Sequence, residues 1–298
     1  MGLLDTIAHC MAHSHDHWLV ALAAAVCAVG VYATFAIARH AARAVGALRP
    51  RWALVSIVSG GCTAWATHFI VLLAYKPGIE AAFDPLVTIA SLACAIVGIG
   101  GGIFVSMRSR RRSQQFLAGL VIGLGIAALH YIGQSAYLVR GSVAWDAVLV
   151  VLSLVVGVPI SGLGMMTLSH RRRSVRRAAP PLLLISIAVL HFCGMAAMTV
   201  HPDPLVRFPA IALSPATITP WVAGVSIALL TLAIFGWRFD LAAKARLRLD
   251  QRRLRELADV ALEGLLICSG DEVITVNQSI ECGSAWKRDP GSGVIGVE

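Results

Sequence analysis

Seven long apolar stretches limit the fold of this chain more than any other feature. Each is free of Asp, Glu, Lys and Arg, and each has the roughly 20 residues that a helix needs to cross a hydrocarbon core of ~30 Å. The stretches are 18–38, 52–75, 86–107, 116–139, 147–169, 178–200 and 216–237. Only 14% of all residues are charged, and the mean hydropathy is +0.77. The predicted fold class is an all-α membrane protein with seven transmembrane helices embedded in a lipid bilayer.

Basic residues are divided unevenly between the loops. Three alternate loops (39–51, 108–112 and 171–177) contain thirteen arginines, whereas the opposite loops contain only Lys76, Arg140 and Arg207. Short arginine-rich loops stay in the cytoplasm. The sequence therefore predicts an external N-terminus and an internal C-terminus. The net charge of +9 is interpreted as a topology signal and an attraction to anionic lipid, with no nucleic-acid partner.

A short string around a lone histidine recurs three times. Its copies are Thr67-His68-Phe69, Leu129-His130-Tyr131 and Leu190-His191-Phe192, at intervals of 62 and 61 residues. This spacing predicts a tandem repeat of three helix pairs followed by one further helix. The histidines occupy the second, fourth and sixth stretches, and we expect them about 10 to 16 Å below the outer edge. They converge if these even-numbered helices are neighbours.

The residues that follow His191 suggest a metal-binding surface. Gly194, Met195 and Met198 are spaced so as to share a helix face with His191. Imidazole nitrogen beside thioether sulfur suits copper better than magnesium or calcium. Gly133 and Gly194, each three residues after a histidine, are expected to let another helix backbone come close.

These copies resemble the MHYT family of bacterial integral-membrane sensor domains. The family pattern, roughly Met-His-Tyr/Phe-x-Gly-Met-x-Ala, is similar to residues 129–136 and 190–197, while residues 67–74 keep the histidine and the aromatic residue. The resemblance covers residues 18–237. It implies a multi-pass protein of the bacterial plasma (inner) membrane that binds copper and thereby senses oxygen, carbon monoxide, nitric oxide or redox state.

The resemblance also implies a ligand set. Of the family's methionines, only Met195 is present. The implied metal ligands are therefore His68, His130, His191 and Met195. The additional ligands or supports are Met198, Cys193, Gln134, Tyr131, Phe69 and Phe192.

Three alternatives stay open on the sequence. The histidines could serve only as hydrogen-bonding groups between helices, with Tyr131 or Ser135 as partners. Paired histidines could ligate haem in a redox protein. Internal repeats with polar groups inside the membrane are also typical of a small metal transporter, although no span contains a carboxylate for coupling.

The chain is expected to have four parts. Residues 1–17 form an external tail rich in histidine, which either binds metal or is a solvated tail. Residues 18–237 form the sensor domain. Residues 238–259 form a charged helix whose leucines, at near-heptad spacing, favour a homodimeric coiled coil or a solvated single helix. Residues 260–298 resemble an incomplete PAS start, with a turn at 269–271 and Asn277 after the second strand, followed by an irregular tail.

The output function is expected to lie elsewhere. MHYT sensors are commonly joined to PAS domains and to cyclic-di-GMP or histidine-kinase domains, and no motif of those enzymes occurs in this sequence. No catalytic residue is proposed, so the chain is not expected to be an enzyme by itself. The prediction is a truncated gene product or fragment that relays a gas or metal signal to a cytoplasmic output protein.

Overall fold

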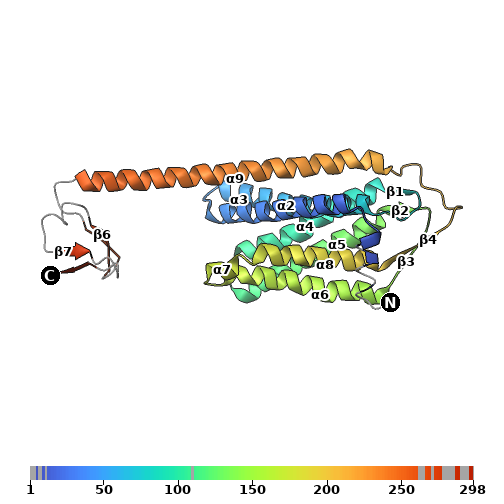
Figure 1. Ribbon diagram of the computed structural model, residues 1–298, viewed down its shortest axis with the longest axis horizontal. Helices are drawn as coiled ribbons and strands as arrows, with labels where there is room; N and C mark the ends of the chain where they lie inside the picture. Colours follow the sequence, from blue (N-terminus) through green and yellow to red (C-terminus); the bar gives the residue numbers. More distant parts are fainter. Residues whose placement is uncertain are drawn as a thin grey trace. The chain divides into compact units, whose positions relative to one another are not determined.

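Every predicted stretch forms a helix in the computed structural model (Figure 1). The structure describes residues 5, 9, 10, 12–108, 111–260, 266–269, 272–276, 286–288 and 295–297. The chain divides into two compact units, residues 1–236 and 237–298. Among the described residues, seven helices are long and apolar enough to cross a membrane, as predicted.

The helices of the first unit are α2 to α8 and the beginning of α9. Their bounds are α2 His17–Arg43, α3 Leu48–Ala74, α4 Pro85–Arg108, α5 Arg112–Ser135, α6 Ala147–Met166, α7 Arg173–Arg176, α8 Ala179–Ala196 and α9 Pro215–Val260. A 3-10 turn, η1 (Thr167–Ser169), follows α6. The helix α9 therefore contains the seventh span and continues into the charged segment 238–259.

Short strands join the helices at one end of the bundle, which we call the strand end. Strand β1 (Ala81–Phe83) pairs antiparallel with β2 (Tyr137–Val139), and β3 (Gly141–Trp145) pairs antiparallel with β4 (Met198–Pro202). The predicted stretches 116–139 and 178–200 were therefore too long, because residues 137–139 and 198–200 are in strands. A short apolar run that ends a helix cannot be distinguished from a strand by hydropathy alone.

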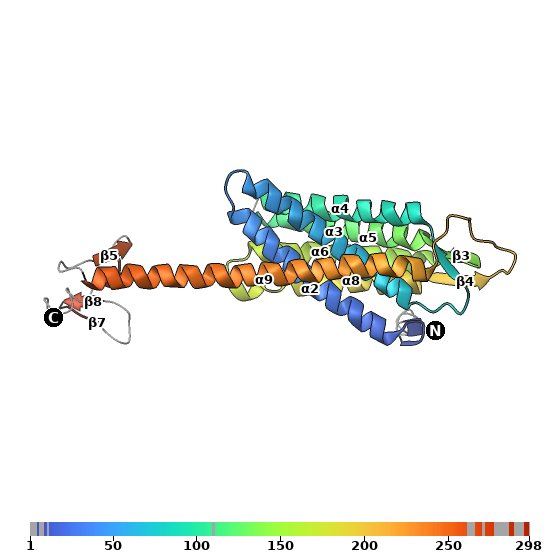
Figure 2. The same ribbon diagram turned by 90° about the horizontal axis from the view of Figure 1, so that it is seen from above.

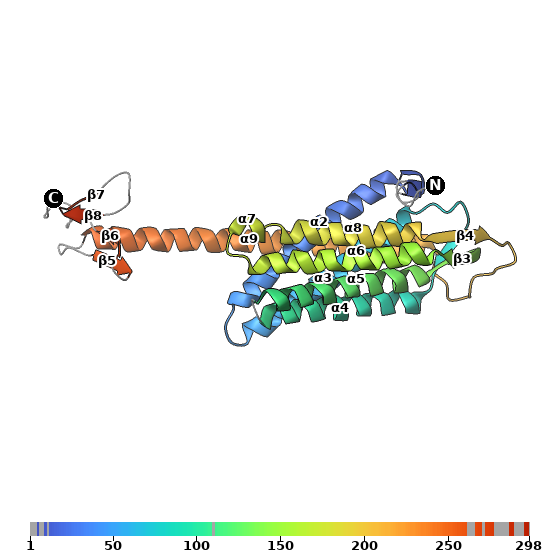
Figure 3. The same ribbon diagram turned by 90° about the horizontal axis from the view of Figure 1, so that it is seen from below.

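The helices form three neighbouring pairs, α2 with α3, α4 with α5, and α6 with α8. Figure 3 shows α8, α6, α5 and α4 side by side, and Figure 2 shows α2 crossing them obliquely. Among the second helices of the pairs, α5 contacts both α3 and α8, and α3 and α8 approach each other at His68 and His191. The predicted repeat of three helix pairs and one further helix is confirmed, and so is the condition under which the histidines converge.

Aspartates start the first helix of each pair. The side chains of Asp16, Asp84 and Asp146 each accept hydrogen bonds from two backbone N–H groups, at 2.8 to 3.3 Å, at the starts of α2, α4 and α6. An aspartate in this position satisfies donors that have no partner inside the helix. The three pairs therefore begin in the same way and at the same end of the bundle.

The second unit contains the rest of α9 and two hairpins. Strand β5 (Leu266–Ser269) pairs with β6 (Glu272–Val276), and β7 (Trp286–Arg288) pairs with β8 (Ile295–Val297). The two strands expected after the charged helix are thus present, whereas the turn residues 270–271 and Asn277 lie outside the described residues. The tail was predicted to be irregular, but it contains the strands β7 and β8, whose apolar residues favour pairing.

Candidate metal centre

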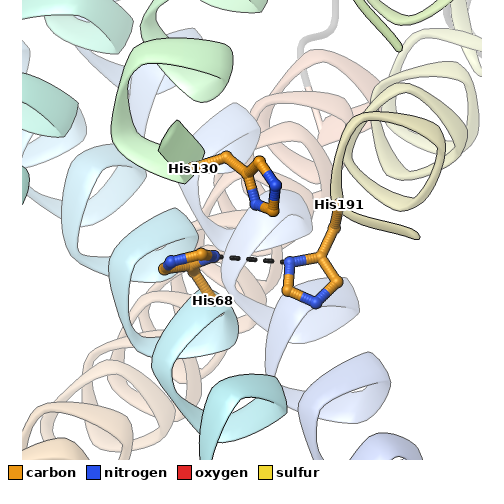
Figure 4. Close-up of side chains that lie close together, drawn as sticks. All are labelled: His68, His130 and His191. Atoms are coloured by element: carbon orange, nitrogen blue, oxygen red, sulfur yellow. Dashed lines mark hydrogen bonds between the residues drawn. The ribbon is translucent and has the colours of Figure 1, made fainter. Parts of the chain in front are cut away.

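Three histidines from three helices of the first unit meet in the space between these helices. Figure 4 shows His68 of α3, His130 of α5 and His191 of α8 turned toward one another. Their ring centroids are 5.1 to 5.4 Å apart. One nitrogen from each ring lies within 4.8 Å of the others. The predicted convergence of the three repeated histidines is present in the structure.

All three histidines lie at the same level. His68 is six residues from the end of α3, and His130 and His191 are each five residues from the ends of α5 and α8. At 1.5 Å per residue, the cluster is about 8 Å from the helix ends. The 10 to 16 Å expected below the outer edge was counted to the ends of the apolar stretches, and the distance to the helix ends is shorter because the last residues of two stretches belong to strands.

The imidazoles are buried and mostly without hydrogen-bond partners. Their exposed fractions are 4% for His68, 2% for His130 and 7% for His191. Nδ1 of His68 and Nδ1 of His191 are 3.3 Å apart and can share a hydrogen bond. Nε2 of all three rings and Nδ1 of His130 have no partner. A buried polar atom without a partner costs about 1–3 kcal/mol. These four nitrogens are therefore available to bind a metal ion or another ligand.

The spacing of the rings is compatible with a metal ion. Ligand nitrogens about 2.0 Å from a tetrahedral ion lie about 3.3 Å from each other. The Nδ1 atoms of His68 and His191 already have this separation. One nitrogen from each ring lies within 4.8 Å of the others, so a small approach of the rings would bring all three to this separation. The donor set contains three neutral imidazoles and no carboxylate, which suits a late transition metal rather than magnesium or calcium.

Two glycines make room for the rings. A Cβ placed on Gly133 would lie 2.5 Å from Nε2 of His68, and a Cβ on Gly194 would overlap Nε2 of His130. The expectation that these glycines let another backbone come close was therefore wrong, because each faces the imidazole of the preceding repeat. Val71 holds the corresponding place in the first copy and lines the same cavity.

The cluster opens into an apolar cavity of about 320 Å³ between α2, α3, α5 and α8. Its lining includes Ala24 of α2 and Ile185 and Ala188 of α8, all exposed on the surface of the bundle. The cavity therefore reaches the apolar outer surface between α2 and α8. Cys27 and Thr67 also line it. Sequence reasoning did not select Cys27, because neither this residue nor its helix belongs to the repeated motif, and it did not select Thr67, although this residue directly precedes His68 in the motif.

The other predicted site residues lie away from this cavity, except Phe192, which lines it. Met198 does not share a helix face with His191, because α8 ends at Ala196 and Met198 is in β4, where its sulfur accepts a hydrogen bond from Gln134. Met195 is buried in the core without lining the cavity, as is Cys193. Two aromatic residues have other contacts, Tyr131 with Ser153 at 2.6 Å and Phe69 with Trp65 and Phe83.

The segment before α2 covers the ends of α3 and α8. His15 is 5% exposed, and its ring lies 5.4 Å from that of Tyr75 and 6.0 Å from that of Phe192. Burial lowers the pKa of His15, so its neutral form is favoured. Asp16 is held by Lys76 at 2.9 Å, and this hydrogen bond lowers the pKa of the carboxyl. This part of the histidine-rich segment is packed against the bundle rather than solvated; Met11 lies outside the described residues.

Comparison with known protein families matches two regions of the chain to one family. Residues 61–119 and 123–180 match the MHYT family, described as a bacterial signalling protein N-terminal repeat. The chain carries MHYT repeats. Together with the seven apolar helices, these repeats make the chain a multi-pass membrane protein with an MHYT sensor domain of the kind found in signalling proteins.

The curated relatives that this chain matches are named as signalling proteins or as cyclic di-GMP enzymes. An uncharacterized signaling protein of Caulobacter vibrioides is 33% identical over 271 residues, which are 90% of this chain and 33% of that protein. Two proteins of Pseudomonas aeruginosa match over shorter regions. The bifunctional diguanylate cyclase/cyclic di-GMP phosphodiesterase MucR is 28% identical over 62% of this chain and 28% of its own length. The cyclic di-GMP phosphodiesterase NbdA is 31% identical over 60% of this chain and 24% of its own length.

This MHYT chain therefore spans about a third or less of the length of these curated relatives. No solved structure matches it.

Proposed function

We propose that the MHYT unit binds one copper ion through His68, His130 and His191 and reports the state of that ion to a cytoplasmic output domain. The observation that carries this proposal is the set of four unpaired, buried imidazole nitrogens from three repeats. Imidazole nitrogen is a suitable ligand for copper. Met195, one turn after His191, is kept as a proposed fourth ligand that would have to turn toward the cavity.

The charge of the site favours the monovalent ion, Cu(I). The cluster contains no carboxylate to neutralise a cation, and the nearby cavity lining is apolar. The cost of burying an ion rises with the square of its charge, so a monovalent ion costs about a quarter of what a divalent ion costs. Three neutral imidazoles therefore hold Cu(I) at a lower electrostatic cost than Cu(II) or zinc.

The cavity supports a gaseous signal. Oxygen, carbon monoxide and nitric oxide are small, weakly polar molecules that dissolve in hydrocarbon. The cavity opens between α2 and α8, at residues that face outward from the apolar part of the bundle. A dissolved gas can thus reach the histidines from the bilayer without passing through the covered strand end.

The relay and the output are inferred from the topology and from the relatives. From the arginine-rich loops we infer that the strand end is outside and the end of α9 is inside the bacterial plasma membrane. The segment 238–259 would pair two protomers and pass the change to a PAS-like segment. Two relatives are named for cyclic di-GMP synthesis or breakdown, so we assign this chain to the input side of cyclic di-GMP signalling.

The test is metal analysis of the detergent-purified chain loaded with Cu(I). The parent protein is expected to retain one copper per chain with an X-ray absorption spectrum of nitrogen ligands. The His130→Ala/His191→Ala variant should lose it. The matched variant His170→Ala/His201→Ala also removes two histidines, but neither belongs to the cluster, and it should keep its copper.

Three outcomes would contradict the proposal. Equal copper in both double variants would place the metal elsewhere. A Soret band in the parent protein would identify haem. A parent protein that binds no metal would leave the histidines with a role in helix packing alone.

A further inference from the structure

A second cavity lies in the other half of the bundle, at the end that carries the arginine-rich loops. Its volume is about 820 Å³, within the range of about 300–1,000 Å³ that small-molecule sites occupy. It is surrounded by residues of α2, α3, α4, α5, α6 and α8, so it is internal to the first unit. Neither the histidine cluster nor the proposed copper site uses it.

The mouth of this cavity is strongly basic. Arg39 and Arg43 from the last turns of α2 line it on one side, and Arg173, Arg176 and Arg177 in and after α7 line it on the other. Within the described part of the chain, no salt bridge is formed by Arg43, Arg173, Arg176 or Arg177. Five guanidinium groups therefore converge on one opening.

Within residues 12–236, no carboxylate lies at this end of the bundle. In residues 12–236 the acidic residues are Asp16, Glu80, Asp84, Asp146 and Asp203. All five lie at the strand end, where three begin helices, Glu80 pairs with Arg140, and Asp203 adjoins β4. Among the described residues, Arg43, Arg173, Arg176 and Arg177 therefore have no acidic partner, which favours the binding of an anion at the mouth.

The interior of the cavity is apolar. Its walls include Val31 and Phe35 of α2, Ile103 of α4, Met165 of α6 and Leu183 of α8. The polar Gln115 in the wall is already bonded, because it accepts from the hydroxyl of Ser106 and donates to the carbonyl of the same residue, each at 2.8 Å. The site thus combines an anion-binding mouth with an interior that suits a hydrocarbon chain.

We propose that this cavity binds one anionic phospholipid, with its phosphate held by Arg43, Arg173, Arg176 and Arg177 and an acyl chain in the apolar interior. Guanidinium groups bind phosphate oxygens in pairs of parallel hydrogen bonds. Basic pockets between transmembrane helices on the cytoplasmic side are typical binding places for anionic headgroups. A soluble phosphate would occupy the mouth and leave the apolar walls without a partner. This inference does not depend on the copper site.

The experiment is native mass spectrometry of the full chain, delipidated in detergent and titrated with phosphatidylglycerol or with phosphatidylcholine of the same acyl chains. The parent protein should bind one phosphatidylglycerol in preference to phosphatidylcholine. The variant Arg173→Gln/Arg176→Gln/Arg177→Gln should bind it about 100-fold more weakly, since each arginine near a headgroup contributes about a factor of five.

A matched variant separates a site from general surface charge. Arg49→Gln/Arg51→Gln/Arg112→Gln removes three exposed arginines from the same end of the bundle, and none of them lines the cavity. It should bind phosphatidylglycerol like the parent protein. An equal loss in both triple variants, or equal binding of the two lipids by the parent, would overturn the proposal. Equally tight binding of glycerophosphoglycerol, which has no acyl chains, would show that the occupant is a soluble phosphodiester.

Discussion

At the scale of single residues, the site depends on glycines as much as on histidines. The ring of His68 packs against Gly133 of the next repeat, and the ring of His130 packs against Gly194 of the repeat after that. Each contact joins one repeat to the next through the position three residues after its histidine. The motif therefore encodes both the ligand and the space for the neighbouring ligand, which explains why histidine and glycine occur together in the second and third copies.

The variant Gly194→Ala should weaken copper binding about 10- to 100-fold, the effect typical of disturbing the residues that orient metal ligands. The new Cβ would overlap Nε2 of His130 and force that ring to move. Copper titration of the purified variant measures the effect. Gly101→Ala is the control, because a Cβ there meets only Val121 at an ordinary 3.7 Å. Parent-like affinity in Gly194→Ala would mean that His130 is not a ligand.

At the scale of elements, the two helices of each pair have different tasks. The first helices, α2, α4 and α6, begin with an aspartate cap at the strand end. The second helices, α3, α5 and α8, carry the histidines and meet in the centre. The strands β1 to β4 link the pairs directly above the cluster. The division keeps the three ligands at one level.

The variant Asp146→Ala should lower the free energy of unfolding by about 1 kcal/mol, because two backbone N–H groups at the start of α6 lose their acceptor. Asp146→Asn should retain most of the stability, since asparagine caps helices about as well as aspartate. Thermal unfolding in detergent compares the three proteins. If asparagine and alanine are equally destabilising, the charge of Asp146 and not its cap is what matters.

At the scale of the whole first unit, the two cavities share a wall. Ala64 of α3, Ile126 of α5 and Ile187 of α8 line both the histidine cavity and the basic cavity. A shift of α8 at Ile187 would thus alter both cavities. The charged residues of this unit are divided between the two ends of the bundle. The aspartates lie at the strand end, and the arginine-rich loops lie at the opposite end.

The proposed orientation predicts different trypsin cleavage from the two sides of the membrane. In right-side-out vesicles, trypsin should reach exposed residues of the strand end such as Arg140 and Arg207 and spare the loop 171–177. In inside-out vesicles it should cut in 108–112 and 171–177. The masses of the fragments distinguish the two patterns. Cleavage of the arginine-rich loops in right-side-out vesicles would mean that the strand end lies in the cytoplasm.

The sequence alone determined the seven spans, the repeat and the three histidines, because hydropathy and spacing are properties of the chain that need no partner. It also located the two strands after the charged helix. It did not predict where α5 and α8 end, since β2 and β4 are apolar and become strands only by pairing with β1 and β3.

Only the tertiary structure decided which residues surround the histidines. Met198 has the spacing of a ligand, yet it lies in β4 and bonds to Gln134, while Cys27 of α2 enters the cavity without any motif to mark it. The basic cavity likewise brings together arginines that are more than 100 residues apart in the chain, such as Arg43 and Arg173. Spacing along one helix fixes which residues share a face, but the packing of several helices decides what that face meets.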